Sequence, residues 1–105
     1  MTQSNFGIPD SVFNDMLGAI REFREIKSAK IFGSRAKGNY KRYSDVDIAI
    51  FTDSEVNLSS SVKDRLDDLY AIYNFDVIDY DKISNTDIKE HIDRVGIEFY
   101  AASKK

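Results

Sequence analysis

Residues 31–38 read IFGSRAKG and residues 44–50 read SDVDIAI, and these two stretches determine the interpretation of the chain. The first is typical of an apolar strand that ends at Gly33-Ser34 and turns through a short cationic segment. The second is typical of a strand on which Asp45 and Asp47 alternate with apolar residues. The pair places backbone N–H groups, cations and two carboxylates around one small space. These are the groups needed for chemistry on a metal-bound nucleoside triphosphate.

Asp45 and Asp47 are two residues apart, so in a strand their carboxylates point the same way, roughly 6.6 Å apart at about 3.3 Å per residue. Their repulsion at an effective dielectric constant near 20 is on the order of 2–3 kcal/mol. A divalent cation would turn that repulsion into attraction, and carboxylate oxygens suit Mg²⁺. An Asp-x-Asp pattern alone also fits two solvated aspartates on an edge strand. The apolar Val46, Ile48 and Ile50 favour a core strand.

The Gly-Ser turn predicts an anion site. Gly33 can adopt a backbone conformation closed to other residues. If Ser34 opens a helical turn, free N–H groups and a hydroxyl face a ligand there, and Arg35 and Lys37 are close enough to help neutralise a triphosphate. A tight turn whose charges are solvated remains the alternative for this motif taken alone.

Composition sets the outer limits. A chain of 105 residues is predicted to be one domain, residues 1–105. Its net charge of −3 argues against nucleic acid as a partner. It has no cysteine, no apolar run near the roughly 20 residues that span a bilayer, and no apolar signal core at its start. We therefore expect a cytoplasmic protein without a membrane partner.

Hydrophobic periodicity predicts an α/β (α+β) fold, with a small mixed sheet and helices packed mainly on one face. Helices are expected over residues 9–25, 58–73 and 87–95, with one helical turn at 34–37. Strands are expected over residues 27–32, 45–51, 75–80 and 97–100. The single histidine, His91, is expected on the third long helix in a solvated or capping role.

The segment FGSRAKGNYKRYSDVDIAIF, residues 32–51, resembles the signature of the DNA polymerase beta-like nucleotidyltransferase superfamily. That signature is a hydrophobic residue, Gly-Ser, a spacer of about ten residues and Asp-hydrophobic-Asp. The segment FDVIDYDKISNTDIKEHIDRVGIEFY, residues 75–100, is similar to the rest of its smallest members, the minimal nucleotidyltransferases. These are often encoded beside a HEPN-domain protein as a toxin–antitoxin pair. The resemblance implies the nucleotidyltransferase fold.

The resemblance also implies site residues. Asp45 and Asp47 would hold Mg²⁺, as two ions, and Asp76 would complete a catalytic and metal-binding triad. Spacing alone leaves Asp76 in competition with Asp79 and Asp81, which alternation places on the opposite face. The nucleotide phosphates would be bound by four residues: Gly33, Ser34, Arg35 and Lys37.

The activity so implied is transfer of AMP from ATP to a hydroxyl, a tyrosine on a partner HEPN toxin, which makes the chain an antitoxin. Two alternatives stay open. One is an antitoxin that neutralises its partner by docking, without catalysis. The other is a subunit of a small-molecule, antibiotic-type nucleotidyltransferase. So small an enzyme is expected to build its acceptor site with another chain, in a homo- or hetero-oligomer, for which residues 97–100 and the tyrosines of residues 40–43 are candidate contacts.

Overall fold

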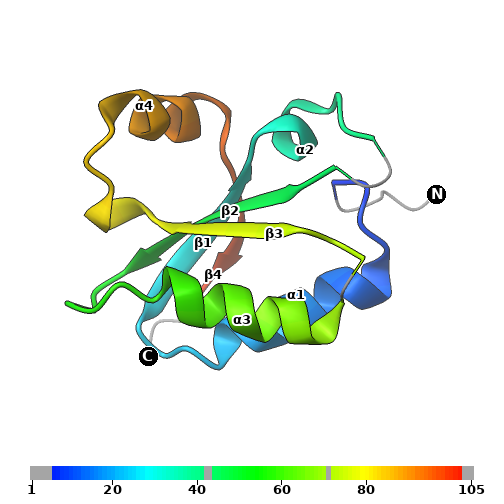
Figure 1. The fold of residues 1–105 in the computed structure, drawn as a ribbon, viewed down its shortest axis with the longest axis horizontal. Coiled ribbons are helices and arrows are strands. Elements are labelled where there is room, and N and C mark those ends of the chain that lie inside the picture. Colours follow the sequence, from blue (N-terminus) through cyan, green and yellow to red (C-terminus); the bar gives the residue numbers. More distant parts are fainter. Residues whose placement is uncertain (1–5, 42–43, 71, 103–105) are drawn as a thin grey trace.

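The computed structural model describes residues 6–41, 44–70 and 72–102. Its centre is a four-stranded mixed sheet with the strand order β3-β2-β1-β4 (Figure 1). The strands are β1 (Ile26–Phe32), β2 (Val46–Thr52), β3 (Phe75–Asp79) and β4 (Ile97–Ala101). β1 is antiparallel to both β2 and β4, whereas β2 and β3 are parallel. The mixed sheet predicted from the sequence is therefore confirmed.

Two long helices cover one face of this sheet (Figure 1). α1 (Asp10–Arg21) buries Val12, Met16, Ala19 and Ile20, and α3 (Ser59–Leu69) buries Val62 and Leu66. The spacing of these residues puts each set on one side of its helix. They pack with Ile48 and Ile50 of β2 into the main hydrophobic cluster. This face of the sheet is the core face.

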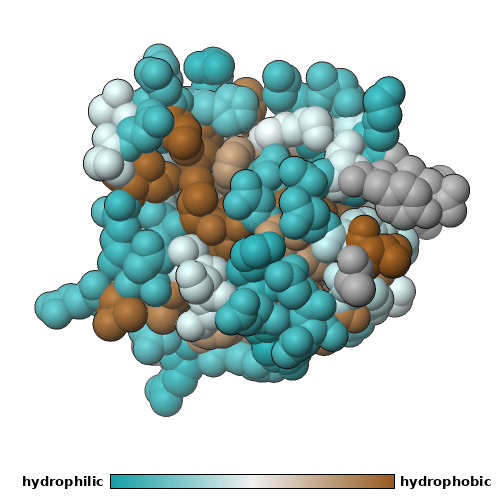
Figure 2. All heavy atoms as spheres, in the orientation of Figure 1, coloured by the Kyte–Doolittle hydropathy of each residue, from teal (hydrophilic) through white to brown (hydrophobic). Residues whose placement is uncertain are grey.

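The opposite face, called the site face below, is only partly covered. Alternation along β2 places Asp47, Ala49 and Phe51 on it. α4 (Thr86–Val95) packs over part of this face, where the ring of His91 meets Phe32 edge-on with centroids 6.0 Å apart. In Figure 2, hydrophobic side chains gather beneath α4 while hydrophilic ones surround them. The site face is thus closed by α4 at one side and open beyond it.

The bounds of several elements differ from the predictions for local reasons. The first helix ends at Arg21 rather than at residue 25, because the Glu22 N–H donates to the Ala19 carbonyl at 3.2 Å and tightens the last turn. The second long helix ends at Leu69, since Tyr70 is already extended. Tyr80 leaves the strand and begins the 3₁₀ turn η1 (Tyr80–Lys82). The predicted single turn at residues 34–37 is confirmed as α2 (Ser34–Lys37).

α4 begins where Asn85 caps it, its side-chain oxygen accepting from the N–H groups of Asp87 at 2.9 Å and Ile88 at 3.2 Å. Across the described part of the chain, every helix is too short or too polar to cross a membrane.

Candidate functional site

The register of the sheet brings Asp47 and Asp76 together. In the parallel pair, Asp47 of β2 lies opposite Asp76 of β3, and Phe32, the last residue of β1, lies opposite Asp47 on the other side. Both carboxylates therefore lie on the site face, near the level of the sheet at which β1 ends. The strand pairing thus places next to each other two carboxylates that are 29 residues apart in sequence.

Gly33 follows β1 and presses against this pair. Its φ of 74° and ψ of −153° belong to a region that is essentially closed to residues with a side chain. A Cβ built on Gly33 would collide with the Oδ2 atom of Asp47. The special backbone conformation predicted for Gly33 is confirmed, and the missing side chain leaves room for the Asp47 carboxylate.

The electrostatics single out Asp47. Burial raises the pKa of its carboxyl from 3.8 to about 6, with further upward contributions from the charges of Asp76 and Asp45 and an opposing one from Arg35. The half-buried Asp47 therefore holds its negative charge at a cost that a neighbouring cation would relieve. Raised carboxyl pKa values of this kind cluster at functional sites.

Asp45 lies just before β2 and is exposed, unlike Asp47. Its Oδ1 atom accepts a hydrogen bond from the Asn74 side-chain amide at 3.1 Å. The Asn74 carbonyl in turn accepts from the Val46 N–H at 3.0 Å, so Asn74 links the beginnings of β2 and β3. Sequence reasoning missed Asn74. Its position directly before a strand that carries an aspartate was the available signal.

The structure also distinguishes Asp76 from the two other candidate aspartates near it, Asp79 and Asp81. Asp79 points to the core face, where its side chain is fully buried, and Asp81 belongs to η1. Asp76 is exposed on the site face. The alternation argument from the sequence therefore holds, and only Asp76 is the strand partner of Asp47.

The four residues expected to bind phosphate differ in their surroundings in the structure. Ser34 opens α2 beside Gly33, and Lys37 is exposed at the end of that turn. The first N–H groups of a helix have no carbonyl within the helix to bond to, and in α2 these begin with the N–H of Ser34. Phosphate binding by Gly33, Ser34 and Lys37 stays a prediction.

Arg35 has a different setting from the one expected. Its side chain is buried, with 2% of its surface exposed, and it donates to the main-chain carbonyls of Phe6 at 2.8 Å and Ser44 at 3.0 Å. Burial lowers the pKa of its guanidinium. The predicted contact of Arg35 with phosphate is not favoured by this geometry, because the group faces the protein interior.

The donor set fits Mg²⁺ in chemistry. Besides burial, the charges of Asp76 and Asp45 raise the pKa of Asp47, and hard oxygen ligands are those that Mg²⁺ takes. Within the described ranges, however, no three acidic, imidazole or thiol side chains are already gathered closely enough to enclose an ion. The Oδ1 atom of Asp45 is instead hydrogen-bonded to the side-chain amide of Asn74.

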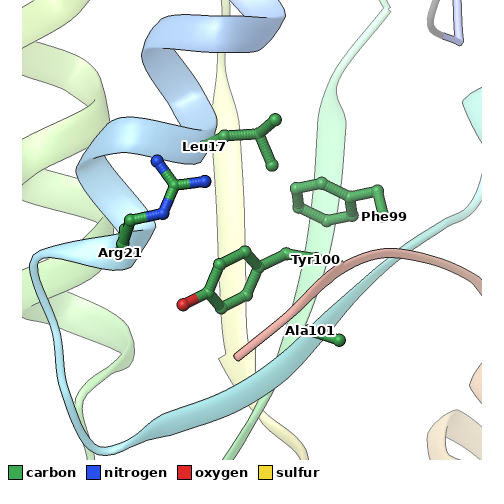
Figure 3. A pocket seen from close by; sticks show the side chains of 5 residues that line it. All are labelled: Leu17, Arg21, Phe99, Tyr100 and Ala101. Carbon is green, nitrogen blue, oxygen red and sulfur yellow. The ribbon is translucent and has the colours of Figure 1, made fainter. Parts of the chain in front are cut away.

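Two open pockets of about 370 Å³ each lie outside this carboxylate group. One is lined by Asp67, Ile72, Tyr73 and Asn74, and the last of these is the hydrogen-bond partner of Asp45. The other lies between the end of α1 and β4, where Leu17 and Arg21 face Phe99, Tyr100 and Ala101 (Figure 3). Because Tyr100 pairs with Ala29, three residues from Phe32 along β1, the second pocket is remote from Asp47.

The remaining sequence candidates have structural contacts. His91 is half-buried against Phe32 rather than solvated, which corrects the expectation for it. In the 40–43 loop, the Tyr40 ring lies 5.3 Å from the Arg35 guanidinium, and residues 42–43 lie outside the described part of the chain.

A mixed sheet with paired carboxylates beside a glycine turn defines a nucleotidyltransferase-like domain. Residues 16–105 match the family model described as Polymerase beta, Nucleotidyltransferase. The chain therefore belongs to the Polymerase beta nucleotidyltransferase family. No curated protein matches it in sequence.

Solved structures with a similar fold include several toxin–antitoxin complexes. A chain in the crystal structure of a toxin–antitoxin with AMP-PNP aligns with a TM-score of 0.72 at 18% identity, over 85% of this chain and 73% of that one. A chain in a mutant MntA–HpeT toxin–antitoxin aligns at 0.70 and 15% identity, over 85% and 72%. A chain in the tri-AMPylated Shewanella oneidensis HEPN toxin in complex with MNT antitoxin aligns at 0.67 and 15%, over 88% and 71%. At these identities the likeness establishes a shared fold.

Proposed function

We propose that the chain is a Mg²⁺-dependent nucleotidyltransferase that transfers AMP from ATP to a hydroxyl of a partner protein. The observation that supports this most directly is the pairing of Asp47 with Asp76, with Gly33 pressed against the Asp47 carboxylate. A family nucleotidyltransferase domain needs acidic groups beside a nucleotide turn, and these residues meet that need.

In the proposed reaction the oxygen of the acceptor hydroxyl forms a bond to the α-phosphorus of ATP. The bond from that phosphorus to the bridging oxygen breaks, and pyrophosphate leaves. Asp76, exposed beside Asp47, is the proposed acceptor for the proton of the hydroxyl. Mg²⁺ held by Asp45, Asp47 and Asp76 would supply neutralisation of the charge on the phosphates.

The other residues position the nucleotide. The backbone N–H groups after Gly33, with the Ser34 hydroxyl, are the proposed donors to phosphate oxygens, and Lys37 is a proposed exposed cation for the same group. Such preorganised donors act by binding charge where it develops, without reorganising during the reaction.

We infer the acceptor from the structural neighbours. Three of them are toxin–antitoxin complexes, one with an ATP analogue and one with an AMPylated HEPN toxin. By this analogy the acceptor is a hydroxyl, such as that of a tyrosine, on a HEPN-domain toxin, and the chain is a cytoplasmic antitoxin. Attachment of AMP would then inactivate the toxin.

The test is a transfer assay with the purified chain, [α-³²P]ATP, Mg²⁺ and a purified HEPN-domain toxin as the acceptor. Label is expected on the partner with the wild-type chain and Mg²⁺, and none is expected with EDTA. Mass spectrometry of the product should show the mass of AMP added to a tyrosine. Equal labelling by the wild type and by Asp47→Asn would remove the proposed site from the reaction.

The same assay separates the alternatives. A docking antitoxin would neutralise its partner equally well in the Asp45→Asn and Asp47→Asn variants. A small-molecule transferase would leave the partner unlabelled and transfer label to an aminoglycoside hydroxyl. The raised pKa of Asp47, caused by burial and by the charges of Asp76 and Asp45, favours catalysis over docking, since a docking surface has no use for a half-buried carboxylate beside two others.

A further inference from the structure

Arg35 is a buried cation in a helix of only four residues. Its side chain is 2% exposed, although α2 itself lies at the surface with Lys37 exposed. Removing a guanidinium from water is costly unless its donors are bonded. A residue kept in such a place is expected to hold several parts of the chain together.

The contacts of Arg35 join three separate segments. Its Nε and Nη2 atoms both donate to the Ser44 carbonyl, at 3.3 and 3.0 Å, and its Nη1 atom donates to the Phe6 carbonyl at 2.8 Å. The rings of Tyr40 and Tyr73 lie 5.3 and 5.7 Å from the guanidinium carbon. The planar fork of arginine can grip one carbonyl with two donors, which the single ammonium of lysine cannot do.

The N-terminal segment is fitted closely around this group. Gly7 has a φ of 77°, and a Cβ built on it would collide with the Tyr40 ring that lies over Arg35. Phe6, whose carbonyl binds Arg35, packs against Phe13 of α1 with ring centroids 6.2 Å apart. The N-terminal segment thus connects Arg35 to the core side of the molecule.

Because Arg35 is hydrogen-bonded to Ser44, its contacts affect the residues that follow Ser44 in the sequence. Ser44 directly precedes Asp45, and Asp47 follows two residues later on β2. The Ser44 hydroxyl accepts from the Lys41 N–H at 2.7 Å, and the Val46 N–H is bonded to Asn74. Arg35 therefore restrains the chain at the start of the segment that carries Asp45, just before β2, and Asp47, within β2.

We propose that Arg35 is a positioning residue for the Asp45–Asp47 strand, clamping the Ser44 carbonyl to α2 and to the N-terminal segment, and is not a ligand of phosphate. This inference rests on the proposed function for its catalytic consequence. Its structural part concerns the ligand-free chain alone.

The first measurement uses the chain without nucleotide, so that loss of a phosphate contact cannot affect it. Binding of Mn²⁺ to wild type, Arg35→Lys and Arg35→Met is followed by EPR well below the unfolding temperature. We expect both variants to bind Mn²⁺ about tenfold more weakly. The matched surface variants Arg24→Lys and Arg24→Met should bind as the wild type does, because Arg24 is exposed before β1.

The second measurement is amide hydrogen exchange. In both Arg35 variants the Val46 amide should exchange at least about tenfold faster, while amides in the middle of the β1–β2 pair keep their protection. Unchanged exchange at Val46 would overturn the proposal whatever the metal result. Unchanged Mn²⁺ binding, with only a raised KM for ATP, would make Arg35 a phosphate ligand instead.

Steady-state kinetics further distinguish a positioning role of Arg35 from a role in phosphate binding. Arg35→Lys is expected to lower kcat about 100-fold, because a small displacement of catalytic groups has effects of that order. Lys37→Met, at the exposed cation of the same turn, is expected chiefly to raise KM for ATP. If the wild type transfers no AMP, the proposed function fails, while Mn²⁺ binding and exchange still decide the role of Arg35.

Discussion

Each face of the sheet holds one buried or half-buried aspartate, and the charged groups around these two aspartates differ. On the core face, Asp79 lies beside Lys82, whose Nζ atom is 3.5 Å from its Oδ2 atom. Neither Asp79 oxygen has a hydrogen-bond partner among the described residues. On the site face, Asp47 lies beside two more carboxylates, and its pKa is raised to about 6.

This difference distinguishes Asp79, a charged side chain that belongs to the packing of the protein, from Asp47, a charged side chain suited to a function. Asp79 has a cation from its own chain close by, and Lys82 is itself fixed to the Ser54 carbonyl at 2.6 Å. At Asp47 the nearby acidic groups outweigh the opposing effect of Arg35. A negative site left uncompensated by its own protein is suited to an external cation and its ligand.

The largest expected effect comes from replacing each aspartate by its amide. Asp47→Asn should lower AMP transfer by about 10³-fold or more, a loss typical of removing a group that acts on developing charge. Asp79→Asn should keep transfer within about twofold of wild type, since it lies on the other face. Initial rates with labelled ATP, measured on folded protein, provide the check. Similar losses in both variants would remove the distinction between the faces.

The variant Gly33→Ala tests whether AMP transfer depends on the close contact between Gly33 and the Asp47 carboxylate. We expect about 100-fold slower transfer, because the new Cβ displaces the Asp47 carboxylate. A loss of about 2 kcal/mol in the free energy of unfolding should accompany it, from the strained backbone.

Gly38→Ala is the matched control for Gly33→Ala. Gly38 also has a positive φ, of 92°, but no atom of the described residues lies within 4 Å of a Cβ built there. It should lose only about 1 kcal/mol of stability and little activity. Urea unfolding and transfer rates on both variants decide, and equal losses of activity would mean that contact with Asp47 is unimportant.

The sequence was sufficient for the strand pattern and for the faces on which the strand aspartates lie, because alternation is a local property, whereas the choice of Asp76 depended on the family resemblance. It placed Asp76 on the face opposite to Asp79, as the structure has it. It could not place Arg35, because a cation beside a glycine turn reads as a ligand contact. Two of the residues around it, Phe6 and Tyr73, come from distant segments, and only Tyr40 is nearby in the sequence. Asn74 was missed for the same reason, since its bond to Asp45 spans 29 residues.

On the core face, Lys82→Met should destabilise the protein by about 2 kcal/mol, because a buried carboxylate is left without its cation. The double variant Lys82→Met/Asp79→Leu should recover most of that loss. Lys27→Met, which breaks the exposed pair of Lys27 with Asp53 at 3.2 Å, should cost no more than about 0.5 kcal/mol. Thermal and urea unfolding would contradict the assignment if Lys82→Met matched Lys27→Met.

The smallest effect concerns pH and the ligand-free stability of the site face. Burial raises the folded-state pKa of Asp47 to about 6 from its ordinary value of 3.8, so between these pH values the folded state holds a proton that the unfolded state has released. The stability of the wild type should therefore fall as pH rises from about 4 to 6 and then level off. Asp47→Asn lacks this contribution.

The expected difference follows from the size of the shift. About two pH units correspond to roughly 3 kcal/mol, which partial solvent access reduces to about 1–2 kcal/mol. Asp47→Asn should thus gain 1–2 kcal/mol over the wild type between about pH 4 and pH 7, and Mg²⁺ should shrink the gain by stabilising only the wild type. The exposed surface variant Asp64→Asn should show no such pH-dependent difference. A pH-independent effect of Asp47→Asn would mean that burial and the neighbouring charges do not raise the pKa of Asp47, and the contrast with Asp79 would then lose its electrostatic basis.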